Sequence, residues 1–297
     1  MGVVKYMYIC NLEYDYISKI SLNDFQEEGR IQLDKAYNDI LRPKNMISHE
    51  DKLFIANSYA NTLIIVDLLS DKVIGEYYIG ANCNDVIIVN KKAYFTCGEC
   101  DSLIIFDLES NSILERVPCG SAPCHVAYDE KKELIVVTNL GDDSINVINF
   151  KDYNENKKIS LESYPTKTLI NKEENIMVVL QSNMGLNKNG KISIIDTVSM
   201  KTIKEVEVGL SPIDIIEEEE NYYVANFLSG TIDIIDKKSF EIVDIMDVGG
   251  MPKKILKHGS YLYILNCLNG SLIRIDILSK EKRSLRLGGE PSAIVIN

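Results

Sequence analysis

The sequence has no tryptophan, only three histidines, and fewer basic than acidic residues. Its 32 Lys and Arg against 44 Asp and Glu give a net charge of −12 over 297 residues. Proteins hold nucleic acids by neutralising phosphates with Lys and Arg, and large aromatic side chains supply the platforms on which bases stack. The composition therefore predicts that no nucleic acid is a partner of this protein.

Long apolar runs are also missing. No segment is apolar over the length that a bilayer requires, and the N-terminus lacks a basic stretch followed by an apolar one. Seven cysteines, an odd number without an export signal, favour thiols in a reducing compartment. The sequence thus predicts no membrane insertion, no signal peptide and a cytoplasmic protein.

Familiar catalytic motifs are absent as well. The sequence contains no nucleophile elbow, phosphate-binding loop or dinucleotide fingerprint. Of the histidines, His49 and His258 fall near inner hairpin turns by their repeat position, so only His125 is a candidate general base. We expect a protein that binds rather than one that catalyses.

What the sequence does contain is a unit of about 42 residues, a period typical of stacked repeats, that recurs seven times. Each unit has an apolar strand that ends in a small polar residue: Asn11, Asn57, Cys97, Asn139, Gln181, Asn226 and Asn266. The next strand ends at Ser21, Asp67, Asp107, Asn149, Asp196, Asp236 and Asp276. A glycine and then a proline usually follow, as in Gly120–Pro123, Gly209–Pro212, Gly249–Pro252 and Gly288–Pro291.

This period, with four short strands in each unit, predicts an all-β, seven-bladed β-propeller of four-stranded antiparallel blades. One closed propeller uses all of residues 1–297 as a single domain. The chain ends on an innermost strand, Pro291–Asn297, and begins on a second strand. We therefore expect one blade to take three strands from the N-terminus and one from the C-terminus, which removes free sheet edges.

The segments Ile135–Asn139 and Tyr222–Asn226, together with the Gly-x-x-Pro spacing, resemble the YVTN-repeat propellers over essentially the whole chain. The resemblance implies the fold and says little about function, because relatives differ widely. They include surface-layer and periplasmic binding proteins and a DNA-binding member. More distant relatives are lactonase, amine dehydrogenase and haem d1 propellers.

Two insertions indicate which end of the blades is functional. Lys35–Pro43 and Ser182–Gly190 are longer than the equivalent segments of the other units. Both belong to the loops that join second to third strands or one blade to the next, which open on the same face. Because function concentrates in loops on rigid scaffolds, we expect this face to bind a partner or ligand.

Six of the seven units carry a polar residue two positions after the proline position, where we expect the first strand to begin. We expect these side chains to surround the mouth of the central channel, where mixed charges would suit a small polar ligand. The alternative is that they only solvate the channel lining. The six candidate ligand-binding residues are Asn45, Asp85, His125, Lys167, Asp214 and Lys254, with Ala293 in the seventh unit.

Several cysteines map to neighbouring units on the same face. Cys97-Gly-Glu-Cys100 has the spacing of a metal knuckle, so zinc or an iron–sulfur cluster is a candidate cofactor. A second such pair is missing, which favours structural thiols instead. The CxxC lacks the following His of covalent haem attachment. The candidate metal ligands are Cys83, Cys97, Cys100, Cys124 and His125.

These features favour a monomeric binding scaffold that engages a protein or a small polar ligand on the loop face. One alternative is a lactonase-like hydrolase with His125 as base and Asp85 or Asp214 as its carboxylate partner. This alternative predicts that the three side chains approach one another at one end of the channel. The other alternative is a structural protein of an envelope or spore layer, cross-linked through its sixteen Tyr and seven Cys.

Overall fold

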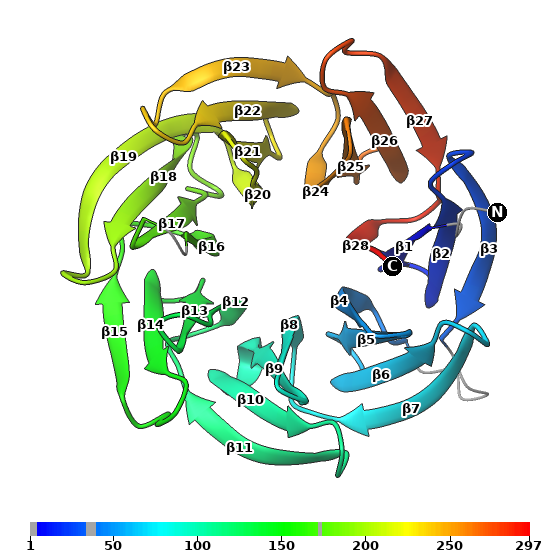
Figure 1. The fold of residues 1–297 in the computed structure, drawn as a ribbon, viewed down its shortest axis with the longest axis horizontal. Coiled ribbons are helices and arrows are strands. Elements are labelled where there is room, and N and C mark those ends of the chain that lie inside the picture. Colours follow the sequence, from blue (N-terminus) through cyan, green and yellow to red (C-terminus); the bar gives the residue numbers. More distant parts are fainter. Residues whose placement is uncertain (1–4, 34–39, 172–173) are drawn as a thin grey trace. The chain divides into compact units, whose positions relative to one another are not determined.

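The computed structural model describes residues 5–33, 40–171 and 174–297. Within these residues, twenty-eight strands form seven four-stranded sheets (Figure 1). The fold is a seven-bladed β-propeller with antiparallel blades, so the fold class predicted from the repeat is confirmed.

Six blades consist of four strands that are consecutive in the chain. The first three comprise β4 (Pro43–His49), β5 (Lys52–Asn57), β6 (Thr62–Asp67) and β7 (Lys72–Tyr78); β8 (Cys83–Val89), β9 (Lys92–Cys97), β10 (Ser102–Asp107) and β11 (Ser112–Pro118); β12 (Pro123–Asp129), β13 (Leu134–Asn139), β14 (Ser144–Asn149) and β15 (Asn156–Ser160). A short 3₁₀ turn, Gly98–Cys100, lies between β9 and β10.

The other three comprise β16 (Pro165–Asn171), β17 (Ile176–Gln181), β18 (Asn189–Asp196) and β19 (Lys201–Leu210); β20 (Pro212–Glu217), β21 (Asn221–Asn226), β22 (Thr231–Asp236) and β23 (Ile242–Asp247); β24 (Pro252–His258), β25 (Tyr261–Asn266), β26 (Ser271–Asp276) and β27 (Lys282–Arg286). Glu218–Glu220 lie in the hairpin between β20 and β21.

The seventh blade joins the two ends of the chain. Its strands are β28 (Pro291–Ile296), β1 (Tyr6–Asn11), β2 (Tyr16–Ser21) and β3 (Gln26–Gln32), in that order across the sheet. β28 pairs antiparallel with β1, with Met7 opposite Ile296 and Ile9 opposite Ile294. The predicted closing blade is therefore confirmed, with one strand from the C-terminal end and three from the N-terminal end.

The aspartates that end the third strands shape the hairpins that follow. The Asp67 Oδ1 accepts hydrogen bonds from the Ser70 backbone N–H at 2.8 Å and from its hydroxyl at 2.6 Å. The same Asp-x-x-Ser turn follows Asp107, Asp196, Asp236 and Asp276. These hydrogen bonds lower the pKa of Asp67, because they stabilise its ionised form.

The central strands of each blade carry the core. In β21, Tyr222, Val224 and Ala225 are fully buried, and β13 buries Ile135 and Val137 in the same way. A blade cannot cover both of its faces alone, so stacking on neighbours buries them. The fourth strands are the exception, because they leave apolar residues such as Val243 and Ile245 more than half exposed.

The first strands begin earlier than the repeat suggested. Outside the closing blade, the prediction placed their start two residues after the proline position, whereas β12 and β20 begin at Pro123 and Pro212 themselves. A bulge separates each proline from the residue two positions on. Proline has no N–H to donate, and the first residue of a strand is one of the few sheet positions that tolerate this loss.

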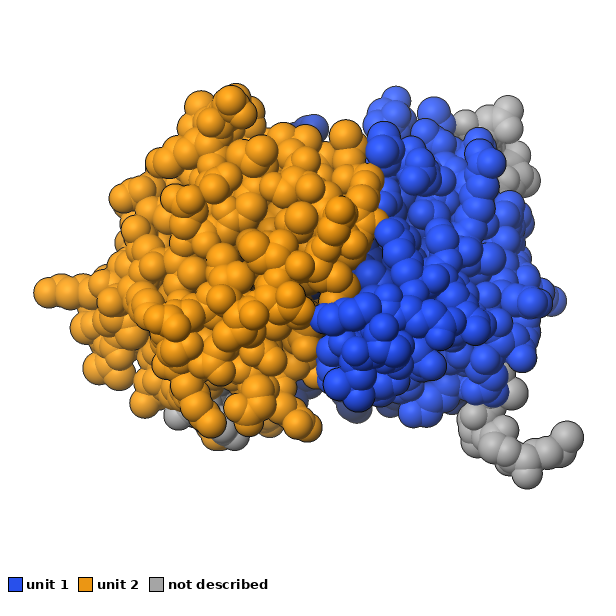
Figure 2. All heavy atoms as spheres, turned by 90° about the horizontal axis from the view of Figure 1, so that it is seen from above, with its two compact units in different colours: residues 1–100, 104–115, 254–297 blue, residues 101–103, 116–253 orange. Residues whose placement is uncertain are grey.

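The chain separates into two compact units (Figure 2). One contains residues 1–100, 104–115 and 254–297, and the other contains residues 101–103 and 116–253. The first unit holds the closing blade, β4–β7 and most of β8–β11 and β24–β27, while β12–β23 belong to the second. A single domain over residues 1–297 stays a prediction.

In the part of the chain that the structure describes, no helix has the length and the apolar character needed to cross a bilayer.

Candidate functional site

The loop end of each blade is organised around its junction, which we define as the segment entering the first strand together with the residue that ends the second strand. At the β12–β15 junction, the Asn146 Oδ1 accepts hydrogen bonds from the Gly120 N–H at 2.9 Å and from the Asn139 Nδ2 at 2.8 Å. The repeated asparagine and glycine therefore serve a structural purpose, because they satisfy buried polar groups where the chain changes blades.

The β20–β23 junction uses a carboxylate for the same purpose. The Asp233 Oδ2 accepts from the Gly209 N–H at 3.0 Å, and the Asn226 Nδ2 donates to Thr231 at 3.1 Å. A methyl group on Gly209 would come within 2.7 Å of the Asn226 amide. Close approach of the asparagine thus explains why glycine occupies this position.

The polar residues two positions after the proline connect consecutive blades. In the first compact unit, the Asn45 Nδ2 on β4 donates to the Asp85 carboxylate on β8. In the second unit, the Lys167 Nζ on β16 lies 2.8 Å from the Asp214 Oδ1 on β20. Asp85 and Asp214 are both buried. Each carboxylate is therefore contacted by a side chain of the blade before it, a neutral amide in one case and an ammonium group in the other.

His125 contacts the backbone of the next blade. Its Nδ1 accepts a hydrogen bond from the Thr168 N–H at 3.4 Å, so the neutral ring would carry its proton on Nε2. The carboxylate of Asp214 is engaged by Lys167, and Asp85 belongs to the other compact unit. The approach of His125, Asp85 and Asp214 to one another stays a prediction, as does the role of Lys254 in ligand binding.

Three of the candidate metal ligands gather at the β8–β11 junction. The Cys83 and Cys97 sulfurs are 2.9 Å apart, and the Cys100 sulfur accepts a hydrogen bond from the Ala81 N–H at 3.2 Å. The Cys124 thiol instead donates to the backbone oxygens of Pro165 and Thr166.

Among the described residues, no group of three or more His, Cys, Asp or Glu side chains has the arrangement of a metal site. None of the seven cysteines, all of which are described, is in a disulfide. Burial raises the pKa of the Cys10 thiol, and it raises the pKa of Cys119 to about 12. Zinc or an iron–sulfur cluster stays a prediction.

The insertions contribute differently to the loop end. Residues 35–39 of the first insertion lie outside the described residues, whereas residues 40–42 lead into β4, which begins at Pro43. In the second, the Asn183 Nδ2 donates to the Asn189 backbone oxygen at 2.6 Å, and this contact closes the loop. Met184 and Leu186 at its tip are exposed.

An aromatic patch, consisting of Tyr14, Ile40, Arg42 and Tyr59, lies on the loops of two consecutive blades in the first unit. The Asp15 carboxylate accepts hydrogen bonds from the Leu41 and Arg42 backbone N–H groups, both at 3.1 Å. The Arg42 guanidinium lies 5.7 Å from the centre of the Tyr59 ring. Tyr59 and Tyr14 are 62% and 53% exposed. The loops are thus held together while their large side chains face solvent.

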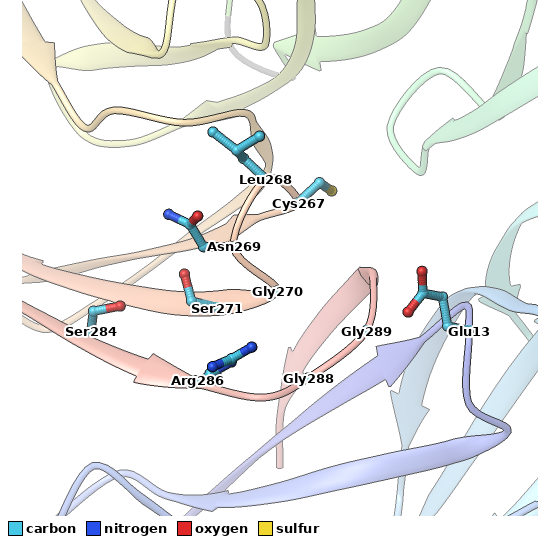
Figure 3. A pocket seen from close by; sticks show the side chains of 10 residues that line it. All are labelled: Glu13, Cys267, Leu268, Asn269, Gly270, Ser271, Ser284, Arg286, Gly288 and Gly289. Atoms are coloured by element: carbon cyan, nitrogen blue, oxygen red, sulfur yellow. The ribbon is translucent and has the colours of Figure 1, made fainter.

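A polar hollow of about 650 Å³ adjoins this patch. Figure 3 shows Ser284 and Arg286 on β27, Ser271 at the start of β26, Asn269 in the loop before it, and Glu13 across the opening. Glu13 is the sequence neighbour of Tyr14. A Cβ on Gly289, which lines the hollow, would come within 2.8 Å of the Tyr14 ring. The hollow and the aromatic patch therefore form one continuous surface.

Sequence reasoning missed both features. Arg286 lies opposite Ser271, where other blades place Tyr78, Ser160, Glu207 or Asp247. Its positive charge at this register position was the available signal. Tyr14 and Tyr59 resemble core residues by composition, and only the loop geometry exposes them.

Comparison with known proteins shows the fold alone. No family model matches the sequence, and no curated protein matches it either. A functionally unknown protein from Desulfotomaculum acetoxidans is 14% identical, with a TM-score of 0.81 and coverage of 98% of both chains. Hydrazine synthase of Kuenenia stuttgartiensis is 17% identical, with a TM-score of 0.69 and coverage of 89% of this chain and 92% of that chain.

A third solved structure is the dihydro-heme d1 dehydrogenase NirN, which is 13% identical, with a TM-score of 0.65. The match covers 98% of this chain and 74% of that one. The three proteins share the propeller fold, and the hydrazine synthase and the dehydrogenase differ in their named functions, so the fold does not determine a function here.

Proposed function

We propose that this protein is a binding scaffold that engages a protein partner through the loop surface formed by the aromatic patch and the adjoining hollow. The observation that carries the proposal is the exposure of Tyr14 and Tyr59 on loops that hydrogen bonds hold in place. Tyrosine and arginine are enriched where protein interfaces gain most of their affinity. A surface that is ordered before binding also loses less entropy on association.

The hollow supplies the polar part of this surface. Ser271, Ser284 and Asn269 offer hydroxyl and amide groups, and Arg286 and Glu13 offer charges of opposite sign. A partner would place an apolar or aromatic side chain against Tyr14 and Tyr59 and a polar side chain in the hollow. A small polar ligand is the alternative occupant of the hollow.

Site-specific photo-crosslinking in cells that naturally produce the protein tests the proposal. A benzophenone amino acid replaces Tyr59 in one variant and Leu69 in a matched control. Leu69 is 81% exposed and lies at the opposite end of the same blade. We expect a discrete cross-linked protein from position 59 that is absent from position 69, and a lower yield when Arg42→Glu is added.

The partner that cross-linking identifies is then purified, and titration of this protein with it measures the affinity. We expect Arg42→Glu or Tyr14→Ala to weaken binding at least about tenfold, which corresponds to about 1.4 kcal/mol. Identical products from positions 59 and 69, or affinity unchanged in both variants, would rule the surface out. A small molecule that co-purifies with the protein, and is lost on Arg286→Ala, would identify the hollow as a ligand site instead.

A further inference from the structure

The β8–β11 junction carries thiols where the other blades carry proline and an amide. Cys83 occupies the proline position that Pro123 and Pro212 hold elsewhere, and Cys97 occupies the position of Asn139 and Asn226. Cys100 follows three residues later, at the end of the 3₁₀ turn. Three of the seven cysteines of the chain are thus concentrated at one end of one blade.

The sulfurs of Cys83 and Cys97 are in direct contact. The two residues lie opposite each other on the antiparallel strands β8 and β9, both side chains are fully buried, and their sulfurs are 2.9 Å apart. The Cys83 thiol donates to the Gly80 backbone oxygen at 3.0 Å. Either thiol can donate in the contact between the two sulfurs.

This pair needs little movement to form a covalent bond. A disulfide requires Cβ atoms about 4 Å apart, and directly opposite residues of an antiparallel pair have theirs about 5 Å apart. The side chains already face each other across the ladder. A slight approach of the two strands would complete the bond.

Cys100 provides access from the surface. It is partly exposed, whereas Cys83 and Cys97 are buried. The Ala81 N–H donates to its sulfur at 3.2 Å, and the thiolate is the form of a cysteine that attacks a disulfide. The Cys97 and Cys100 sulfurs lie 3.0 and 3.6 Å from the point that a Cβ of Gly80 would occupy. The glycine thus leaves the space between these two sulfurs open.

We propose that Cys83, Cys97 and Cys100 form a thiol–disulfide exchange site that reacts with low-molecular-weight disulfides and stores the product as a Cys83–Cys97 disulfide. The proposal is independent of the partner surface. It concerns a covalent modification of the junction rather than the binding of a ligand.

The reaction consists of three exchanges, each through attack of a thiolate on a sulfur. The Cys100 thiolate attacks the small disulfide RSSR, which gives a mixed disulfide and releases RS⁻. Cys97 then attacks the Cys100 sulfur and expels the second RS⁻. Cys83 attacks the Cys97 sulfur and returns Cys100 as a thiolate. Two protein thiols are oxidised and one RSSR is reduced to two RSH, with two protons passing from the cysteines to the products.

Incubation of the folded protein with oxidised glutathione tests the proposal. Alkylation after unfolding should then detect five thiols instead of the original seven. Cleavage after Lys91, Lys92 and Glu99 places the three cysteines on separate peptides. We expect one linked pair, between the peptides that contain Cys83 and Cys97, and restoration of both thiols by a reductant.

Variants separate the steps. Cys83→Pro and Cys97→Asn restore the residues of the other blades, so they preserve the junction, and each should abolish the link. Cys100→Ser should slow its formation at least about tenfold, because the buried thiols lose their exposed relay. Cys267→Ser, which changes a partly exposed cysteine of another blade, should leave the rate unchanged.

Three results would overturn the proposal. One is seven alkylatable thiols after the incubation. Another is a glutathione adduct on Cys100 as the final product. The third is an equal rate of link formation in Cys100→Ser and Cys267→Ser, which would remove Cys100 from the reaction. Thermal melting of each variant confirms that it is folded before the assay.

Discussion

At the β20–β23 junction, Asp233 accepts a hydrogen bond from Gly209 of the entering segment and Asn226 donates to Thr231, whereas cysteines fill the equivalent space at the β8–β11 junction. Both segments follow a similar path, and both begin with a glycine, Gly209 or Gly80. The fold therefore requires a compact group that fills this space, and not one particular chemistry. The amides hold their junctions through hydrogen bonds, while the thiols fill the same space and keep the capacity for the disulfide exchange that we propose.

The largest expected effect comes from removing the strand that closes the propeller. Deletion of residues 291–297 takes away β28, exposes the edge of β1 and breaks the hydrogen bond of Ser292 to the Pro43 backbone oxygen. We expect the cooperative thermal transition to disappear, since an open edge and an uncovered core remain. A truncated protein that melts like the full chain would mean that each blade, and each junction, is stable without closure.

The next largest effect is the loss of stability when the residue that ends a second strand is replaced by alanine. Asn226→Ala would remove one donor from the buried Asp233 carboxylate, which keeps the Gly209 N–H, and would remove the donor to the Thr231 hydroxyl, at a cost of about 2–3 kcal/mol. Cys97→Ala removes only a buried sulfur, for which we expect about 1 kcal/mol, since its hydrogen bond is weak and the cavity is small. Denaturant midpoints measure both, and equal losses would mean that the amide adds nothing beyond packing.

Alanine in place of Gly209 or Gly80 should give a smaller difference in stability between the two junctions. In Gly209→Ala the methyl group would lie 2.7 Å from the Asn226 amide, whereas in Gly80→Ala it would lie 3.0 Å from the Cys97 sulfur. Overpacking costs about 1–3 kcal/mol. We expect Gly209→Ala to destabilise the protein more than Gly80→Ala, because the Asn226 side chain is hydrogen bonded and cannot move aside as easily. Melting temperatures of the two variants test this order. A greater loss in Gly80→Ala would show that the thiol junction is the tighter one.

The smallest effect concerns charge. Burial raises the pKa of Asp233, against the opposing hydrogen bonds from Asn226 and the Gly209 N–H. The folded state therefore holds the proton more tightly than the unfolded state. The contribution of Asp233 to the free energy of unfolding is full below the ordinary pKa of 3.8, and it declines as pH rises through the folded-state pKa.

Asp233→Asn removes this decline and keeps an acceptor for Gly209, as Asn146 does at the β12–β15 junction. We expect a melting temperature a few degrees higher than that of the unsubstituted protein at pH 7, and a smaller difference at pH 4. A difference that does not change between these two pH values would show that the carboxylate is not perturbed.

The repeat predicted the strands well because the residues that terminate them have local causes. Asn226 ends β21 and Asp236 ends β22, as expected, since one amide satisfies the junction and one carboxylate shapes the following turn. The starts of the first strands were misplaced by two residues, because a proline that opens a strand with a bulge looks like a proline before the strand.

The candidate site was predicted less completely. Asp85 at the mouth of the central channel stays a prediction, and its pairing with Asn45 depends on how consecutive blades are oriented, which no single repeat contains. Cys83 and Cys97 were grouped with Cys124 and His125 by proximity in the repeat. Their direct opposition follows from strand register. The aromatic patch was missed because exposure depends on loop geometry.

The residue that follows the bulge has a consequence for how a repetitive chain assembles in the right order. Asn45 pairs with Asp85, and Lys167 pairs with Asp214, so in these two pairs of consecutive blades the group at this position suits its successor. Seven identical repeats could exchange places or pair with blades of another molecule. If β16 carried the aspartate of β20, two buried carboxylates would face each other, which is strongly unfavourable. Because the residue at this position differs between otherwise similar repeats, these contacts favour one order of blades over its permutations.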